Sequence, residues 1–187
     1  MFISKINIDL NKNSNYIGFA DAGYFHSKIE NCFEGDREHP LWTIMGSNII
    51  MISHREPDIP ITFGKSQTKK YDLQIPEGSV LHYRITANPT TKINGKRVPL
   101  NVNKTKKYPY SAIDWLKERL NANGADVLTI DVTEHKNINA KRSKVKVFAV
   151  TYEGSLVVKD WNKFKIILEN GIGHAKTYGC GLLLVRR

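Results

Sequence analysis

The sequence predicts an α+β fold of two tandem ferredoxin-like (RRM-like) domains, with residues 1–78 in the first and residues 79–187 in the second. The second half has the element order β-α-β-β-α-β, which is the ferredoxin-like order, and the first half shows a weaker version of it with its second helix hard to see. A chain of 187 residues with 41% hydrophobic content can bury one ordinary core or two small ones. Pro76-Glu77-Gly78 marks the boundary between the domains.

The first domain opens with a strand over residues 2–10, where apolar and polar residues alternate with period two. A helix over residues 19–33 follows, because Ala22, Phe25 and Ile29 recur at helical spacing. Gly18, just before this range, and Gly23 within it each cost the helix about 1 kcal/mol relative to alanine. The other predicted strands of this domain cover residues 42–45, 48–53 and 71–75.

The second domain begins with an alternating strand over residues 81–87, in which Arg84 points away from the apolar face. A polar loop then leads to a helix over residues 111–123, where Ser111 and Asp114 resemble a capping box. The remaining predicted elements are strands at 126–133, 144–152 and 156–158 with Glu153-Gly154 as a turn, a helix at 160–168 and a strand at 180–185.

Four glycines lie within eleven residues between that last helix and strand, at Gly171, Gly173, Gly179 and Gly181. Such a density indicates left-handed backbone angles or a close approach of another group. The connection is expected to expose a row of amides beside Lys176, which suits a phosphate group. The alternative is a glycine-rich connection that binds no ligand.

The formal net charge of +10 favours a polyanionic partner, either nucleic acid or an anionic membrane. No apolar run approaches the roughly 20 residues of a membrane-spanning helix, so a membrane is the weaker candidate. Cys32 and Cys180 are the only cysteines, and they lack the spacing of a disulfide framework or a zinc site. A cytoplasmic protein without a metal or cofactor is expected.

Two segments are basic and contain no acidic residue. The first, over residues 79–113, carries seven lysines and arginines, with Tyr108 and Tyr110 beside them. The second lies between two predicted strands, over residues 136–146, and period-two alternation puts Lys144 and Lys146 on one face. Either segment alone is compatible with a solvated surface, but the two together favour nucleic acid.

Several motifs in this sequence resemble one known family. The run G-I-G-H-A-K-T-Y-G-C-G-L-L-L over 171–184, Y-R-I-T-A-N-P over 83–89 and K-R-V-P-L over 96–100 are similar to those of the CasE-type CRISPR-associated endoribonucleases, the repeat-RNA processing subunits of type I-E Cascade. The resemblance covers nearly the full chain and implies two fused ferredoxin-like domains.

The resemblance implies a metal-independent endoribonuclease that cuts CRISPR precursor RNA at the base of the repeat hairpin. The products would carry a 2′,3′-cyclic phosphate and a 5′-hydroxyl, and the enzyme would stay on the mature crRNA beside the other Cascade subunits. A basic hairpin in the second domain would engage the RNA stem. The predicted RNA-binding residues are Arg84, Lys96, Arg97, Lys141, Arg142, Lys144, Lys146, Gly171, Gly173 and Lys176.

No cluster of carboxylates and histidines suggests a two-metal nuclease, so cleavage would use the 2′-hydroxyl of the RNA as nucleophile and need proton transfer and positive charge at the phosphate. The resemblance selects His26, in the first helix, for proton transfer. The family has a tyrosine one helical turn earlier, where this chain has Gly23, and the role is carried over to Tyr24. His174 is a rival for proton transfer, whereas His39, His54, His82 and His135 have no constellation around them.

Two other functions remain open at this point. His26 lies about 40° around the helix from Ala22, at the margin of the apolar stripe, and is therefore compatible with a packing role. In that case the chain would be a non-catalytic subunit that binds an RNA hairpin. A ferredoxin-like scaffold for an acidic protein partner is the third possibility.

Overall fold

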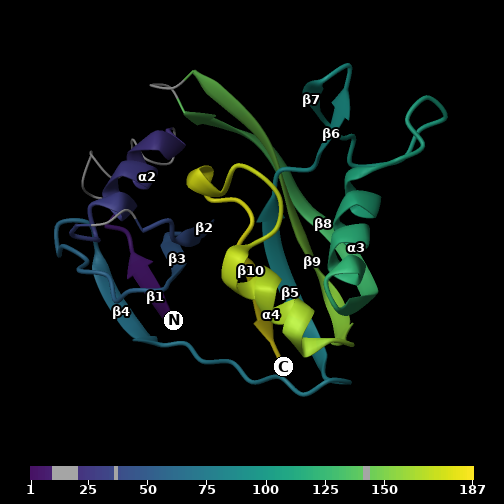
Figure 1. Cartoon of the computed structure of the whole chain (residues 1–187). Coiled ribbons are helices and arrows are strands. Elements are labelled where there is room, and N and C mark those ends of the chain that lie inside the picture. The colour runs from purple at the N-terminus through teal and green to yellow at the C-terminus, as the bar shows by residue number, and fades with distance from the viewer. Residues whose placement is uncertain (10–20, 36–37, 141–143) are drawn as a thin grey trace.

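Two four-stranded antiparallel sheets form the body of the molecule, and a short two-stranded hairpin projects from the second (Figure 1). The computed structural model describes residues 1–9, 21–35, 38–140 and 144–187. Both sheets have the same order: the fourth strand of the domain lies beside the first, then the third and then the second. The predicted α+β layout with two sheets is confirmed.

The first sheet has the order β2-β3-β1-β4, and helix α2 packs on it. Phe25 and Ile29 of the helix are buried against Trp42, Met51 and Phe63, so the predicted helical face is the one that reaches the core. The elements of this domain are β1 (Phe2–Asn7), α2 (Ala22–Glu30), β2 (Leu41–Met45), β3 (Asn48–Ser53) and β4 (Lys65–Lys70).

The fourth strand of this sheet differs from the prediction. It covers Lys65–Lys70 and pairs with β1, whereas residues 71–75 form no strand. K-S-Q-T-K-K has no apolar alternation, because β4 is an exposed edge strand that the backbone ladder to β1 holds in place. Residues 54–64, all of them described, contain no helix, so the second helix of the ferredoxin-like order is missing here.

The second sheet has the order β10-β5-β9-β8, with α3 and α4 packed on one face (Figure 1). β5 alternates as predicted, with Leu81, Tyr83 and Ile85 buried in the core beneath the two helices. The Ser111–Asp114 capping box of α3 is confirmed. The main elements are β5 (Val80–Ala87), α3 (Ala112–Ala122), β8 (Ala125–Ala140), β9 (Val145–Val158), α4 (Trp161–Asn170), the 3-10 turn η1 (Lys176–Tyr178) and β10 (Leu183–Arg186).

A short hairpin of β6 (Thr90–Ile93) and β7 (Lys96–Pro99) occupies part of the segment predicted as a polar loop. Its turn residues, Asn94 and Gly95, have φ values of 48° and 76°. Positive angles at both positions are those of the type I′ turn, for which Asn-Gly is a preferred pair. The prediction of a polar loop without strands is therefore wrong over this stretch.

The long hairpin, formed by β8 and β9, extends well beyond the sheet toward the top of the view (Figure 1). The predicted turn at Glu153-Gly154 is wrong, because β9 runs without interruption through both residues. Gly154 instead allows a close approach between strands: a Cβ there would lie 2.1 Å from the Thr129 carbonyl oxygen, beside a β-bulge in β8.

Cys32 and Cys180 are buried free thiols, and burial raises their pKa, to about 11 for Cys32 and about 12 for Cys180. They are therefore protonated and unreactive at neutral pH. None of the helices in the described part of the chain is long and apolar enough to cross a bilayer.

A histidine-lined cleft between the two domains

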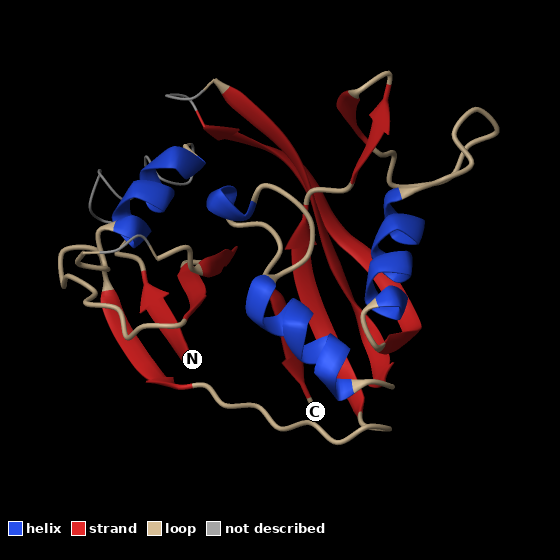
Figure 2. Ribbon diagram, in the orientation of Figure 1, coloured by secondary structure: helices blue, strands red, loops and turns tan. Residues whose placement is uncertain are grey.

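A cleft of about 530 Å³ lies where the two domains meet. One wall comes from the first domain, through α2, residues 38–42 and His54. The other wall comes from the end of α4 and from η1, through Glu169, Asn170, Lys176 and Thr177. Figure 2 shows α2 and the small helix η1 facing each other at this junction. We refer to it as the His26 cleft.

His26 is held at the rim of this cleft by the helix that carries it. The α2 helix begins at Ala22, where the Gly23 amide donates to the Asp21 carboxylate at 3.0 Å. Phe25 and Ile29 anchor the helix in the core, which leaves 29% of the His26 side chain exposed. Its Nε2 lies 3.3 Å from Glu30 Oε1, one turn later, so the carboxylate can orient the imidazole.

Two further histidines line the same cleft, although sequence reasoning found no constellation around them. His39 precedes β2 and His54 follows β3, so the pairing of these two strands brings both to the cleft. The Glu38 carboxylate accepts from the His54 amide at 2.9 Å. Within the described ranges, no group of three or more His, Cys, Asp and Glu side chains is placed to hold a metal ion.

Tyr24 does not line the cleft. Two residues along a helix correspond to about 200°, which puts Tyr24 on nearly the opposite side of α2 from His26. Its ring packs on Phe25 with centroids 5.8 Å apart and lies 5.6 Å from Lys28 Nζ. The structure thus does not bring the two predicted catalytic residues together.

The glycine loop, residues 171–181, has the predicted left-handed angles, with φ between 70° and 91° at all four glycines. The predicted row of free amides is wrong at the two ends of the loop, because the amides of Gly171, Ile172, Gly179 and Gly181 each donate to a backbone carbonyl. Lys176 Nζ donates to the Asn170 carbonyl at 2.5 Å, which holds its ammonium at the end of α4 and at the edge of the cleft.

The glycines let the loop pack against one tryptophan from each domain. A Cβ on Gly179 would lie 2.8 Å from the ring of Trp42, and one on Gly173 would lie 2.9 Å from the ring of Trp115. Both indoles are almost fully buried. The loop therefore joins the domains, and an added methyl group would crowd an indole before it reached any bound RNA.

Gly179→Ala should lower the free energy of unfolding by about 3 kcal/mol, because strain at positive φ adds to overpacking against Trp42. Gly46→Ala is the matched control: its φ is also positive, at 59°, but nothing lies within 4 Å of the added methyl group. That variant should lose only about 1 kcal/mol. Urea denaturation measures both, and equal losses would show that Trp42 does not constrain the loop.

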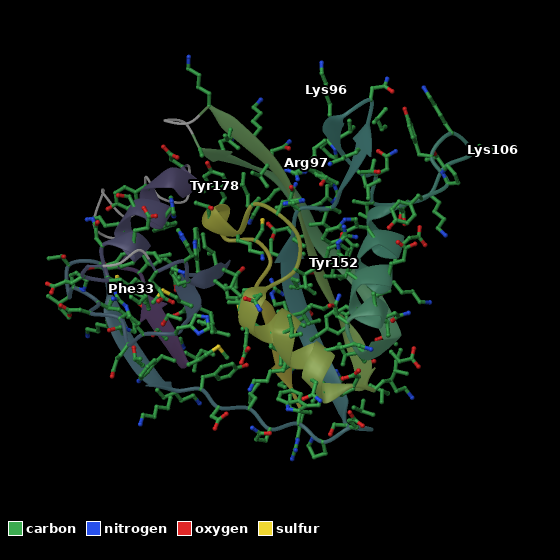
Figure 3. The ribbon with its side chains drawn as sticks, in the orientation of Figure 1. Phe33, Lys96, Arg97, Lys106, Tyr152 and Tyr178 are labelled. Atoms are coloured by element: carbon green, nitrogen blue, oxygen red, sulfur yellow. The ribbon has the colours of Figure 1, made fainter. Side chains whose placement is uncertain are left out.

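The predicted RNA-binding lysines and arginines lie mostly on the two hairpins. Lys141 and Arg142 fall outside the described residues. Lys144 lies in the turn, with φ of 54°, so it does not share a strand face with Lys146 as predicted; both are exposed. On the short hairpin, Lys96 points outward, whereas Arg97 lies between β7 and the glycine loop (Figure 3).

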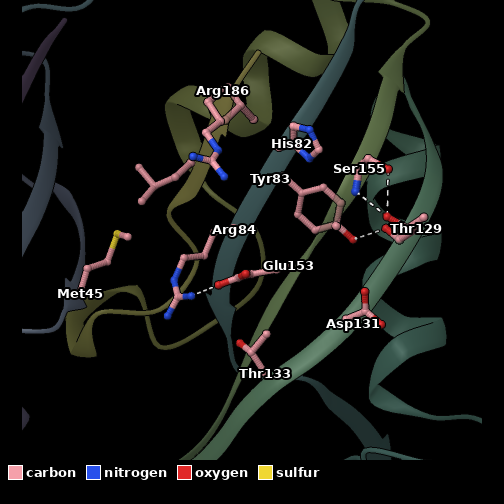
Figure 4. A pocket seen from close by; sticks show the side chains of 13 residues that line it. Met45, His82, Tyr83, Arg84, Thr129, Asp131, Thr133, Glu153, Ser155 and Arg186 are labelled. Atoms are coloured by element: carbon pink, nitrogen blue, oxygen red, sulfur yellow. Dashed lines mark hydrogen bonds and ion pairs between the residues drawn. The ribbon is translucent and has the colours of Figure 1, made fainter.

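Arg84 lies elsewhere, in a cavity of about 580 Å³ that is lined by the strands of the second sheet and by Met45 of β2. Its guanidinium pairs with the Glu153 carboxylate, and Asp131 and Arg186 line the same cavity (Figure 4). This cavity is somewhat larger than the His26 cleft, but it shares no lining residue with it and carries nearly balanced charges. The two cavities are therefore separate, and only the His26 cleft combines histidines with an unbalanced cation at its edge, Lys176.

Tandem ferredoxin-like sheets, cationic hairpins and a histidine-lined cleft between the domains define a class of α+β protein suited to a polyanionic substrate. The sequence model of the family described as "CRISPR associated protein" matches residues 1–187. The chain belongs to the CRISPR-associated endoribonuclease family that includes Cse3 and CasE.

Two curated relatives support this assignment. The CRISPR-associated endoribonuclease Cse3 of Thermus thermophilus is 27% identical over 183 residues, with 84% of each chain covered. The CRISPR system Cascade subunit CasE of Escherichia coli is 30% identical over 147 residues, with 74% of this chain and 73% of CasE covered.

Solved structures agree on the fold. Thermus thermophilus Cse3 bound to an RNA representing a pre-cleavage complex superposes with a TM-score of 0.86 at 24% identity, covering 100% of this chain and 98% of that one. A chain of a CRISPR RNA-guided surveillance complex superposes with a TM-score of 0.72 at 25% identity, covering 99% of both. The predicted tandem ferredoxin-like fold is confirmed.

Proposed function

We propose that this protein is a metal-independent endoribonuclease that cuts CRISPR precursor RNA at the base of the repeat hairpin. The observation that carries the proposal is the His26 cleft, where an imidazole from the first domain and the Lys176 ammonium from the second line one cavity. Family membership gives the substrate class, since relatives are named as CRISPR endoribonucleases and one is described bound to RNA.

The chemistry needs two proton transfers. The 2′-hydroxyl of the RNA loses its proton and attacks the phosphorus, the bond from phosphorus to the 5′-oxygen breaks, and the leaving oxygen gains a proton. His26 performs one of these transfers. His39 and His54 are the other imidazoles of the cleft and are positioned to supply the second. The products carry a 2′,3′-cyclic phosphate and a 5′-hydroxyl.

Negative charge accumulates on the phosphate oxygens as the nucleophile attacks, and a fixed cation stabilises it. Lys176 fits this role because its hydrogen bond to Asn170 fixes the ammonium at the edge of the cleft. An ammonium carries three protons, so two of them remain for phosphate oxygens.

The long hairpin is the element we assign to the RNA stem. Its tip carries Lys144 and Lys146, both exposed, and the sequence adds Lys141 and Arg142 beside them. Contacts of this kind position a duplex through its phosphates. Because one relative is named a Cascade subunit, we propose that the protein stays on the mature crRNA with other Cascade subunits, in the cytoplasm.

A specific observation favours one alternative, a non-catalytic subunit that binds the hairpin. The family's tyrosine position is Gly23 in this chain, and Tyr24 lies outside the cleft. In that case His26 would have only a structural role, through its contact with Glu30 on the surface of α2.

The deciding experiment incubates the protein with candidate repeat hairpins in EDTA and sequences the RNA ends. We expect one cut at the base of the stem, with cyclic phosphate and 5′-hydroxyl ends. An RNA with a 2′-deoxy sugar immediately 5′ to the cut is the control, because it lacks the nucleophile. Tight binding without any cut would support the non-catalytic alternative.

A further inference from the structure

A cluster of positive side chains lies on the second-domain side of the glycine loop and is separate from the His26 cleft. An isolated β-bridge between His174 and Asn88 ties the loop to the start of the short hairpin. Arg97 lies between that hairpin and the loop (Figure 3). Arg119 of α3 stacks on the ring of Trp115, and the glycine loop packs on the same ring, so Arg119 lies near the loop. We call Lys92, Arg97 and Arg119, whose positive charges act on His174, the cation cluster.

Carboxylates of the described residues do not form ion pairs with the cations of this cluster. Lys92 and Arg97 are directly opposite each other across the short hairpin, an arrangement that is unfavourable for like charges. Among the ion pairs between described residues, none includes Lys92, Arg97 or Arg119. The two carboxylates of nearby α3 are already engaged, Asp114 by Lys104 and Glu118 by Tyr110. A surface with these charges favours an anionic ligand.

Part of the cluster is fixed in advance. The Arg119 guanidinium carbon lies 4.1 Å from the centre of the Trp115 ring, and Nη1 donates to the Trp115 carbonyl at 3.3 Å. Trp115 is buried, and its ring lies where a side chain on Gly173 would be. Arg119 therefore loses little freedom when it binds an anion, which is how preorganised groups gain affinity.

The positive charges of this cluster act on the imidazole of His174. Partial burial lowers the pKa of its imidazole, and the charges of Arg97, Arg119, Lys176 and Lys92 lower it further. All four of these charges are positive, so their effects on the imidazole add. A phosphate bound here would be attracted by all of them.

We propose that the cation cluster is a second RNA site, which binds phosphates of the single-stranded segment next to the repeat hairpin. This inference rests on the proposed function. Lys176 connects the two sites, because it lines the His26 cleft and its charge also lowers the pKa of His174. A strand whose scissile phosphate lies at His26 therefore continues across the glycine loop to Arg97 and Lys92.

The test uses His26→Ala protein, so that the RNA stays intact, and compares a bare hairpin with hairpins that carry a single-stranded extension on the 5′ or the 3′ side. We expect one extension to tighten binding. Adding Lys92→Ala and Arg97→Ala should remove that gain and reduce the salt slope for the extended RNA by roughly 1.4, about 0.7 for each phosphate that is no longer bound. The bare hairpin should bind as before.

Lys69→Ala is the matched control, because Lys69 is an exposed lysine on the edge strand of the first domain. Lys69→Ala should change neither the affinity for the bare RNA hairpin nor the affinity for the extended one. The second site would be overturned if the double variant kept the gain in affinity, or if neither extension gave one. In both cases binding of the bare RNA hairpin would leave the proposed function intact. An equal weakening for the bare hairpin would assign the cluster to the stem and overturn the single-strand proposal. Failure of both RNAs to bind would overturn both proposals.

An NMR titration of His174 gives an independent readout. Arg97→Ala should raise the pKa of the imidazole, because a repelling cation is removed. Extended RNA should raise it as well, through the bound phosphate. If inorganic phosphate shifts this resonance at matched ionic strength and extended RNA does not, the cluster binds a small anion and the RNA assignment is wrong.

Discussion

His26→Ala should lower the rate of RNA cleavage by about 10² to 10⁴, which is the usual contribution of a general acid or base. The imidazole lies at the rim of the cleft, and its removal takes away a proton-transfer group without disturbing the buried side chains of α2. Hairpin affinity should stay nearly unchanged, because the proposed stem contacts lie on the long hairpin. Single-turnover cleavage and equilibrium binding measure the two quantities separately.

Ser27→Ala provides the control, since Ser27 is an exposed neighbour on the same helix and lies outside the cleft. It should cut at the wild-type rate. Cleavage that persists in His26→Ala but disappears in His174→Ala would move proton transfer across the glycine loop. A parallel decrease of rate and hairpin affinity in His26→Ala would make the residue structural.

Replacing Lys141, Arg142, Lys144 and Lys146 together with alanine should flatten the salt dependence of hairpin binding. Each phosphate contact contributes roughly 0.7 to 0.9 to the log-log slope through counterion release, so four contacts account for about 3. The affinity at low salt should fall steeply as well. Binding measured over a series of salt concentrations gives the slope.

Lys65, Lys69 and Lys70 make a useful comparison set, because they are exposed lysines on the edge strand of the first domain. Their replacement should leave the slope within the error of the wild type. A weaker affinity with an unchanged slope in the quadruple variant would mean that the long hairpin does not contact phosphates.

The sequence specifies the second domain better than the first, for a physical reason. β5 alternates because one of its faces is buried beneath helices, and α3 carries a complete capping box, so local pattern and tertiary environment agree. β4 gives no such signal. Its position is fixed by pairing with β1, which a single sequence does not reveal.

Some differences were nonetheless readable in the sequence. Asn94-Gly95 is a strong hairpin signal that outweighs the polar composition of its surroundings. A glycine at position 154 is compatible with a turn or with a close approach between strands. The two are distinguished only by the structure, in which the Thr129 carbonyl occupies the space that a Cβ would need. A glycine alone therefore does not locate a turn.

The candidate site, like the fold, could be predicted only in part from the sequence. Family motifs identify His26 and Lys176, but His39 and His54 reach the cleft only because β2 pairs with β3. The glycine loop was expected to present amides to a ligand, whereas the amides at its two ends donate to backbone carbonyls and two of its glycines accommodate indoles. Density of glycine predicted the backbone angles and not the purpose they serve.

The order of the cleft's walls along the chain has a consequence for biosynthesis. Residues 26–54 supply one wall, and residues 169–177 supply the other. A ribosome-bound chain that has not yet released residues 169–177 can pair all four strands of its first sheet, but it has only half of a cleft. On the proposed assignment of cleavage to the His26 cleft, we expect a nascent chain to be unable to cut RNA beside its own ribosome until translation has passed the glycine loop.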